Sequence, residues 1–404
     1  MTAKTPVILI VVGITGDLST RKLLPAIEAI AQQDALPEKF FLLGTTRQSG
    51  VAMDAVCRNV TGPFVREHLQ FFQMDVNDPS AYERLAKRLL EVEKSFGASA
   101  QRLFYLSVPP DASGPIIERL GESGLADVPQ TKLLLEKPFG VDLESATELV
   151  EHIGKFFKPE QVYRIDHYLA KEMVQNLIAR RRRDADAWNK GVIERIEIIA
   201  TEKVGIEGRV DFYEQTGALR DFLQNHLLQL AAVTCGHPGQ DEAKGMPERR
   251  LTALKSFSIP SDKPLTSYVR RGQYRGYRAE VRNPESVVET YVSLTLRSSD
   301  PSFVDVPITL ITGKKLSEKK TEIRIVYKKD SDSKRDDLTF TDEPSSDAYE
   351  KVLLAAMLSD RDLFVSSGEV LESWRVTAPV QEEWKKGSTD LFTYVDGSDV
   401  STLR

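Results

Sequence analysis

Apolar positions in the first third of the chain fall into four short continuous runs, separated by stretches with helical periodicity. The runs cover residues 7–12, 40–43, 103–108 and 132–135, and the helical stretches cover residues 22–33, 79–93, 115–121 and 143–156. Apolar runs without polar alternation are typical of parallel strands buried on both faces of a sheet. Their alternation with helices predicts a doubly wound α/β sheet of the Rossmann type.

The pattern changes after residue 157. It predicts a helix over 170–183, a strand over 192–201 and a long apolar helix over 217–234. Residues 287–296 and 321–327 alternate with period two, which indicates an antiparallel sheet with one face in water. We therefore predict an α/β Rossmann-type dinucleotide-binding domain over residues 1–163. An α+β domain with a large, mainly antiparallel sheet is predicted over residues 164–404.

Length and composition agree with two folded domains. The chain has 404 residues, and a single hydrophobic core stops growing at about 250–300 residues. The formal net charge of −6 leaves no overall basic excess for binding nucleic acid or an anionic membrane. No apolar stretch is long enough to span a bilayer or to form a signal peptide. Two distant cysteines, Cys57 and Cys235, give no disulfide framework and fit a reducing cytoplasm.

The first predicted strand ends in Gly13-Ile14-Thr15-Gly16-Asp17-Leu18, directly before a helix. At such a turn, backbone N–H groups and the positive end of a helix can meet a dinucleotide pyrophosphate. The match to the usual three-glycine fingerprint is partial, because Ser19 stands nearest to the third glycine position. Glycines after a buried strand can also simply form a turn. The flanking strand and helix favour a nucleotide site.

The end of the second predicted strand favours NADP over NAD. An NAD site usually places a carboxylate there for the ribose 2′-hydroxyl, whereas an NADP site offers arginine to the 2′-phosphate. The sequence Gly44-Thr45-Thr46-Arg47 supplies hydroxyls and an arginine, with no carboxylate before Asp54. The alternative is that Arg47 is an ordinary exposed arginine.

His167 lies among several hydrogen-bond donors, in the sequence Arg164-Ile165-Asp166-His167-Tyr168-Leu169-Ala170-Lys171. A phosphate dianion needs several donors and at least one cation, and the imidazole, phenol and ammonium groups of this segment supply them. The alternative is a helix start with assorted polar groups.

His226 lies in the predicted apolar helix, where a lone histidine is usually a core residue. Four polar side chains crowd the same two turns and indicate a hydrated cleft instead: Asp221, Gln224, Asn225 and Gln229. At about 100° per residue, Asp221 lies about 140° around an α-helix from His226 and is poorly placed to orient its ring. The carboxylate partner should come from elsewhere, and Asp166 is the natural candidate.

Four motifs together resemble the glucose-6-phosphate dehydrogenase family. They are residues 13–18, Glu136-Lys137-Pro138-Phe139-Gly140, residues 164–176 and residues 220–229, in the order and approximate spacing of that family. The resemblance runs from residue 7 to about residue 327 and returns at 347–364 and 372–379. It implies the two-domain fold predicted above, with the substrate site and the dimer contact in the second domain.

The resemblance also implies a role for each matching residue. His226 matches the general base, Asp166 its carboxylate partner, and Lys137 a lysine near both substrate and nicotinamide. The implied substrate ligands are His167, Tyr168 and Lys171 for the 6-phosphate, with Glu202, Asp221, Lys314 and Lys319 as further contacts. The implied cofactor contacts are Gly13, Thr15, Gly16, Asp17, Leu18, Lys22, Arg47, Pro109 and Lys137.

The implied reaction is oxidation of the C1 hydroxyl of glucose 6-phosphate to 6-phosphogluconolactone, with hydride transfer to NADP, or to NAD in its place, and without a metal. The resemblance further implies a cytoplasmic homodimer or homotetramer. Because the overall charge is negative, the anionic ligands require a local basic cleft. Its expected members are Lys22, Arg47, Lys137, Lys171 and Lys314.

The chain departs from the family at three places. Ser19 stands where alanine is usual, and Lys319 stands where arginine often occurs, which weakens any second phosphate clamp there. Residues 328–344, largely charged, replace a longer set of strands that usually shapes the dimer interface and, in some members, a second structural NADP site. We do not predict that second site, and we expect the shortening to fall within 328–346.

Three alternatives remain for the function. Glucose/fructose oxidoreductase-like proteins share the Glu-Lys-Pro sequence but lack the Arg-Ile-Asp-His-Tyr-Leu block. A non-catalytic regulatory relative would not need His226, Asp166 and Lys137 together. A sugar with a sulfonate or another anionic substituent could use the same donors as glucose 6-phosphate.

Overall fold

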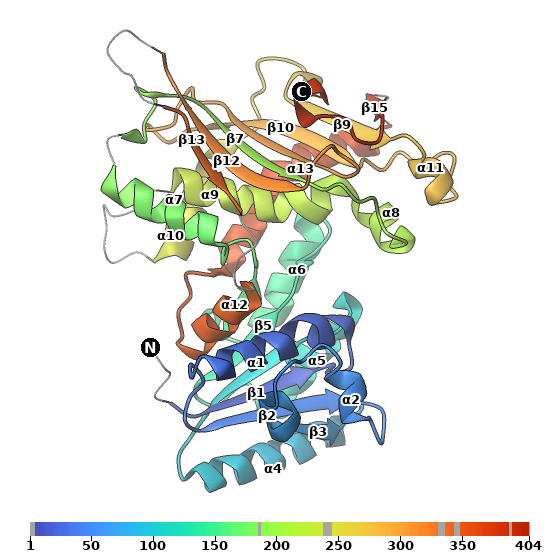
Figure 1. The fold of residues 1–404 in the computed structure, drawn as a ribbon, viewed down its shortest axis with the longest axis vertical. Coiled ribbons are helices and arrows are strands. Elements are labelled where there is room, and N and C mark those ends of the chain that lie inside the picture. Colours follow the sequence, from blue (N-terminus) through green and yellow to red (C-terminus); the bar gives the residue numbers. More distant parts are fainter. Residues whose placement is uncertain are drawn as a thin grey trace. The chain divides into compact units, whose positions relative to one another are not determined.

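The computed structural model describes residues 5–184, 187–236, 245–329, 336–342, 348–387 and 390–403, which fold into two compact units (Figure 1). The first unit comprises Met1–Gly140, Glu144–Ala170 and Ser346–Ser367. The second comprises Val141–Leu143, Lys171–Ser345 and Gly368–Arg404. The predicted single boundary after residue 163 differs from this division. The first unit continues to Ala170 and regains a C-terminal segment, because a strand of that segment joins its sheet.

The first unit is built on a seven-stranded sheet with the order β14-β6-β5-β4-β1-β2-β3. Its strands are β1 (Val7–Val12), β2 (Phe40–Thr46), β3 (Leu69–Gln73), β4 (Gln101–Leu106), β5 (Thr131–Leu135), β6 (Val162–Ile165) and β14 (Phe364–Val365). Neighbouring strands are parallel except for β14 and β6. The order of β3 to β6 is that of a doubly wound dinucleotide-binding sheet, which confirms the predicted fold class. The sequence pattern did not predict β3, β6 or β14.

Helices cover both faces of this sheet. One face carries α1 (Leu24–Gln32), α3 (Phe64–His68) and α12 (Ala348–Met357). The other carries α4 (Pro79–Phe96), α5 (Pro110–Glu122) and α6 (Leu143–Gly154). A π-helical turn, η1 (Ser19–Leu23), leads into α1, while α2 (Met53–Val56) and the 3₁₀ turn η2 (Pro159–Gln161) are short. Asp78 caps α4 by accepting a hydrogen bond from the backbone N–H of Ser80 at 3.0 Å.

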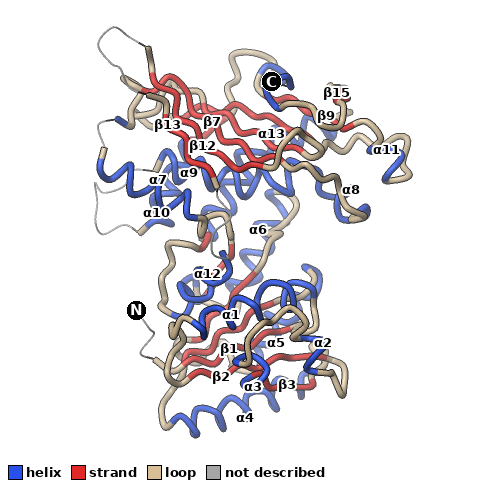
Figure 2. The backbone as a smooth tube through the Cα atoms, in the orientation of Figure 1, coloured by secondary structure: helices blue, strands red, loops and turns tan. Residues whose placement is uncertain are grey.

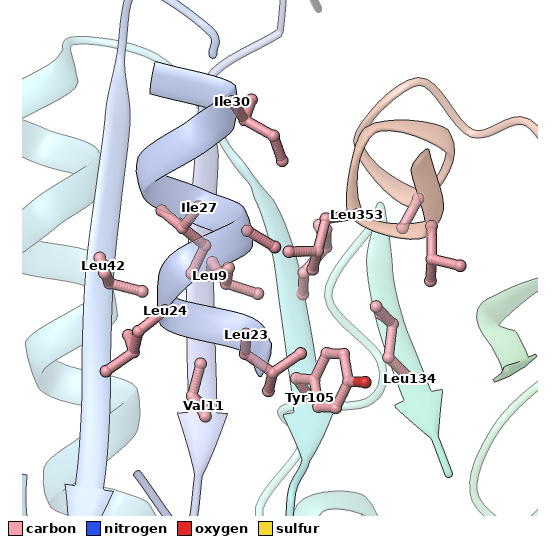
Figure 3. Packing of buried hydrophobic residues seen from close by; sticks show 14 of the residues in the cluster. Leu9, Val11, Leu23, Leu24, Ile27, Ile30, Leu42, Tyr105, Leu134 and Leu353 are labelled. Carbon is pink, nitrogen blue, oxygen red and sulfur yellow. The ribbon is translucent and has the colours of Figure 1, made fainter. Parts of the chain in front are cut away.

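The core over α1 shows why these segments form their elements. Leu24, Ile27 and Ile30 recur at helical spacing and are fully buried against strand residues such as Leu9 (Figure 3). Leu353 of α12 packs into the same cluster (Figure 3). The C-terminal segment thus completes the hydrophobic core of the first unit.

The second unit is built on an eight-stranded mixed sheet with the order β13-β12-β7-β11-β10-β9-β15, and β8 pairs with β10. Its strands are β7 (Ile193–Thr201), β8 (Phe257–Ser258), β9 (Val269–Tyr274), β10 (Tyr291–Ser298), β11 (Ile308–Gly313), β12 (Lys320–Tyr327), β13 (Leu338–Thr341) and β15 (Leu391–Tyr394). The pairs β7–β11 and β9–β15 are parallel, and the other neighbours are antiparallel. The predicted mainly antiparallel sheet is confirmed.

Helices line one face of this second sheet (Figure 2). They include α7 (Glu172–Arg183), α9 (Leu228–Cys235), α10 (Met246–Ser256) and α13 (Ser367–Lys385). Shorter elements are α8 (Val210–Ala218), α11 (Tyr277–Glu280) and the 3₁₀ turns η5 (Leu265–Ser267) and η6 (Val400–Leu403). The helix predicted over 217–234 is present in two parts, a π-helical segment η4 (Leu219–Leu227) followed by α9. Of the charged stretch 328–337, residues 330–335 lie outside the described residues. None of the described helices combines the length and apolar character needed to cross a bilayer.

Candidate active site

In the first unit, five parallel strands end at the same edge of the sheet. The register pairs Val12 with Thr45 and Leu106, Leu106 with Leu135, and Leu135 with Arg164. Ligands of doubly wound sheets bind outside these carboxyl ends. The predicted residues in the segments after the five strands are Gly13–Leu18, Arg47, Pro109, Lys137, and Asp166 with His167 and Tyr168.

The loop after β1 requires glycine at position 13. Gly13 has φ +88°, and a Cβ there would lie 2.4 Å from the carbonyl oxygen of Ser107. Ser19, nearest to the third glycine position, is buried, and its hydroxyl donates to the Gly13 carbonyl at 3.0 Å. Ser19 also lies 2.9 Å from the Ser107 hydroxyl oxygen. This serine therefore ties the loop to the end of β4, which accounts for the departure from the glycine fingerprint.

The remaining predicted cofactor residues of this loop region face solvent. Thr15, Asp17 and Lys22 are exposed, and Leu18 is half-buried before η1. Arg47 is exposed just after β2. Exposed Pro109 precedes the first turn of α5. Three features together fit a dinucleotide with a 2′-phosphate: the loop after β1 that requires glycine, the helix that begins directly after this loop, and Arg47 at the end of β2.

The ends of β5 and β6 carry the titratable groups of the first unit. Asp166 is buried, and its carboxylate accepts a hydrogen bond from the backbone N–H of Tyr168 at 3.0 Å. The imidazole of His167 lies 5.0 Å from the Tyr168 ring, centroid to centroid. Glu136, directly before Lys137, accepts a short hydrogen bond from the Tyr105 hydroxyl. Burial raises the pKa of the Glu136 carboxyl to about 7.

In the second unit, Glu202 and Lys314 follow the adjacent parallel strands β7 and β11. Lys314 is 3% exposed; its ammonium group makes a short ion pair with Glu202 and lies 5.3 Å from the centroid of the Tyr213 ring. Exposed Lys319 directly precedes β12, whose Lys320 pairs with Thr201 at the end of β7. The register therefore brings Lys319 to the same edge as Glu202.

His226 and Asp221 lie on η4 of the second unit, and the π-helical geometry changes their relation. His226 is 2% exposed, and its ring forms a T-shaped pair with the Phe222 ring at a centroid distance of 5.1 Å. In a π-helix, hydrogen bonds join residues five apart, which then lie on one face. The prediction that Asp221 is poorly placed to orient the His226 ring assumed α-helical geometry, and that premise is wrong.

A buried carboxyl fixes the start of η4. Glu289 accepts a hydrogen bond from the backbone N–H of Leu219 at 2.8 Å, and burial raises the pKa of the Glu289 carboxyl to about 7. Gly217 has φ +62° and ψ 177°, and a Cβ there would lie 2.5 Å from Glu289 Oε1. Glycine at 217 thus allows Glu289 to cap the segment that carries His226.

Two of the expected basic groups have carboxylate partners within the second unit. Lys171, just before α7, makes a short ion pair with Asp342, which follows β13. Lys314 makes the ion pair with Glu202 described above. The positive charge expected of the basic cleft is therefore partly compensated in this structure.

The structure thus groups the predicted residues by unit. Gly13–Leu18, Lys22, Arg47, Pro109, Lys137 and Asp166–Tyr168 belong to the first unit, and Lys171, Glu202, Asp221, His226, Lys314 and Lys319 belong to the second. The pairing of His226 with Asp166 stays a prediction. Sequence reasoning missed Glu136, although it adjoins Lys137, and it missed Tyr105 and Glu289, which carry no motif.

Comparison with protein families decides the relationship. The family model described as "Glucose-6-phosphate dehydrogenase, NAD binding domain" matches residues 10–176. The model described as "Glucose-6-phosphate dehydrogenase, C-terminal domain" matches residues 184–339 and 332–402. The chain belongs to the glucose-6-phosphate dehydrogenase family. This is the family that the four sequence motifs resemble.

Individual members of the family are similar over nearly the whole chain. The glucose-6-phosphate 1-dehydrogenase of Chlamydia muridarum is 32% identical over 478 aligned positions, which cover 97% of this chain and 93% of the relative. The crystal structure of the Mycobacterium avium enzyme has a TM-score of 0.80 at 26% identity and covers 97% of this chain and 95% of its own. A glucose-6-phosphate dehydrogenase solved with its substrate glucose-6-phosphate has a TM-score of 0.86 at 24% identity, covers 100% of this chain and 98% of its own, and shows the shared fold.

The match to the C-terminal family model is divided into two stretches. The two matched stretches of the C-terminal family model overlap at residues 332–339, so the match breaks there. The break lies within 328–346, where the sequence predicts that family strands are missing.

Proposed function

We propose that this protein is an NADP-dependent glucose-6-phosphate 1-dehydrogenase, which oxidises the C1 hydroxyl of glucose 6-phosphate to 6-phosphogluconolactone. The observation that carries the proposal is the polar cluster at the ends of β5 and β6, on a sheet with dinucleotide-binding order, in a chain of this family. The imidazole of His167, the phenol of Tyr168 and the ammonium group of Lys171 supply the mixed donors that a sugar phosphate needs.

In the proposed mechanism, His226 takes the proton of the C1 hydroxyl while the C1 hydrogen leaves with its electron pair. Asp166 holds the imidazole in the tautomer that can accept this proton. Lys137 fixes the substrate and stabilises the charge that develops on the C1 oxygen. Glu202, Asp221, Lys314 and Lys319 contact the remaining substrate oxygens. NADP, when bound, supplies the hydride acceptor at C4 of its nicotinamide ring.

The loop after β1 fits the cofactor, because it lies between the first strand of the sheet and the start of a helix, where backbone N–H groups can meet a pyrophosphate. Gly13, Thr15, Gly16, Asp17 and Leu18 would hold the pyrophosphate. Lys22 and Arg47 would complement the cofactor's phosphates. We further propose that the enzyme is cytoplasmic and forms a homodimer or homotetramer, as the resemblance implies.

Reduced-nicotinamide absorbance tests the proposed function directly. The purified chain should reduce NADP with glucose 6-phosphate at least about a hundredfold more efficiently, in kcat/KM, than with plain glucose, because plain glucose leaves the phosphate donors unpaired. If a sulfonated glucose has a higher kcat/KM than glucose 6-phosphate, the substrate is the sulfonated sugar instead. Absence of turnover with every sugar, with NAD or NADP, would favour a non-catalytic relative.

Arg47 is expected to determine the preference for NADP. Arg47→Ser should raise KM for NADP about 10–100-fold, because a charge-assisted hydrogen bond to the 2′-phosphate is lost, and should change KM for NAD less than about threefold. Arg84→Ser on α4, which removes the same charge from an exposed arginine paired with Asp78, should change neither value. Equal losses with both cofactors would contradict this role.

A further inference from the structure

Tyr349 occupies a position in the first unit that no sequence motif marks. It lies in the first turn of α12, within the segment Ser346–Ser367. Leu353 packs this helix into the core cluster with α1 (Figure 3). Buried Lys132 of β5 donates a hydrogen bond to the Ala356 carbonyl at the other end of the helix. Both ties hold α12 against the strands that carry the candidate site.

Tyr349 contacts residues from two adjacent strand ends. Its ring lies nearly parallel to the imidazole of His167, with an interplanar angle of 15° and a centroid distance of 6.1 Å. Its hydroxyl makes a hydrogen bond with the carboxyl of Glu136. The side chain therefore bridges the residue after β6 that is predicted to bind phosphate and the residue that precedes Lys137.

The carboxyl of Glu136 is held from two sides. The Tyr105 hydroxyl donates to it from β4, and Tyr349 binds it from α12. Burial raises the pKa of Glu136 to about 7, the two phenols and Lys137 oppose that rise, and the charge of Asp166 adds to it. A carboxyl between two phenol donors has little rotational freedom, so Glu136 offers Tyr349 a rigid anchor.

We propose that Tyr349 is a positioning residue for the substrate phosphate, because it aligns the His167 ring by face contact while its hydroxyl is anchored on Glu136. The inference rests on the proposed function, since His167 must receive the phosphate. When the aromatic face of Tyr349 is removed, the His167 imidazole can rotate away from the bound phosphate. Affinity should then fall for the phosphorylated sugar, whereas the reaction with plain glucose should be unaffected.

The test compares Tyr349→Leu, which removes both contacts, with Tyr349→Phe, which keeps the ring. Calorimetric titration with glucose 6-phosphate should show about tenfold weaker binding for Tyr349→Leu and less than about threefold for Tyr349→Phe, the range of one lost charge-assisted contact. The kcat/KM for plain glucose should stay within about twofold in both variants. Tyr82→Phe removes a hydroxyl that binds the Val76 carbonyl on the other face of the sheet and should behave as wild type.

Equal losses for glucose and glucose 6-phosphate in Tyr349→Leu would overturn the inference, as would unchanged phosphate affinity. If Tyr349→Leu does not fold, Tyr349→Met takes its place, because it also lacks the aromatic face that stacks on His167. The same titrations with glucose 6-phosphate then decide. Unchanged affinity for glucose 6-phosphate in that variant would overturn the inference. Wild-type turnover is measured separately, so its absence would defeat the proposed function while the titrations still report on Tyr349.

Discussion

His226→Asn is expected to lower kcat for glucose 6-phosphate oxidation about 10³–10⁴-fold while KM changes less than about threefold. Asparagine keeps a polar side chain of similar reach in the buried position but cannot accept the C1 hydroxyl proton. The proton must then leave to water, which a buried site disfavours. Steady-state kinetics with saturating NADP measure both constants, and circular dichroism checks that the helices remain.

Lys171→Met is the matched comparison for His226→Asn. It removes an ammonium group predicted to bind phosphate, so it should raise KM for glucose 6-phosphate about 10–100-fold and leave kcat within about threefold. The partner Asp342 is only half-buried, so the lone carboxylate can be hydrated when Lys171 is lost. Turnover that survives in His226→Asn, or a kcat loss of similar size in both variants, would refute the assignment of the general base.

The sequence pattern predicts strands well where they are buried on both faces. Residues 7–12 form such a run, and the whole of β1 is buried. The pattern missed β6, because its four residues include the buried Arg164, which breaks the apolar run. It missed β3 because this edge strand is exposed at Gln70 and Gln73. A fully buried strand has a clear sequence signal, whereas a short or edge strand depends on its neighbours in the sheet.

The geometry of η4 could not be predicted from the hydrophobic pattern, because its nine residues are too few to distinguish a π-helical period from an α-helical one. Within η4, the side-chain amide of Asn225 donates hydrogen bonds to the backbone carbonyls of Arg220 at 2.9 Å and of Asp221 at 3.2 Å. The crowd of polar residues around His226 was the available signal. It indicated an unusual helix without saying which kind.

Long-range contacts account for most of what the sequence left undetermined in the site. The ion pair of Glu202 with Lys314 depends on the parallel pairing of β7 and β11, which no sequence motif predicts. The contact of Tyr349 with His167 depends on the return of Ser346–Ser367 to the first unit. Motifs identify the side chains that bind or react. The groups that hold those side chains in place are determined by the sheet register and by the return of Ser346–Ser367 to the first unit.

Gly217→Ala is expected to destabilise the protein by about 3–5 kcal/mol, because two costs add. The backbone at φ +62° and ψ 177° lies in a region that only glycine occupies readily. The new Cβ would lie 2.5 Å from Glu289 Oε1 and displace the carboxyl from the Leu219 N–H, leaving a buried donor unpaired. Urea unfolding followed by circular dichroism measures the loss. Because η4 starts at Leu219, the folded fraction should also lose activity through a displaced His226.

Gly208→Ala separates the clash from the backbone strain. Gly208 has φ +77°, precedes α8 in the same unit and is exposed, and a Cβ there would meet no atom of the described residues beyond its chain neighbours within 4 Å. Alanine there should cost only the conformational strain, about 1–2 kcal/mol, with kcat unchanged within about twofold. The difference between the two variants then measures the cap that Glu289 provides to η4. Equal destabilisation by both substitutions would show that Glu289 moves aside without cost, and that it does not hold the helix of His226 in place.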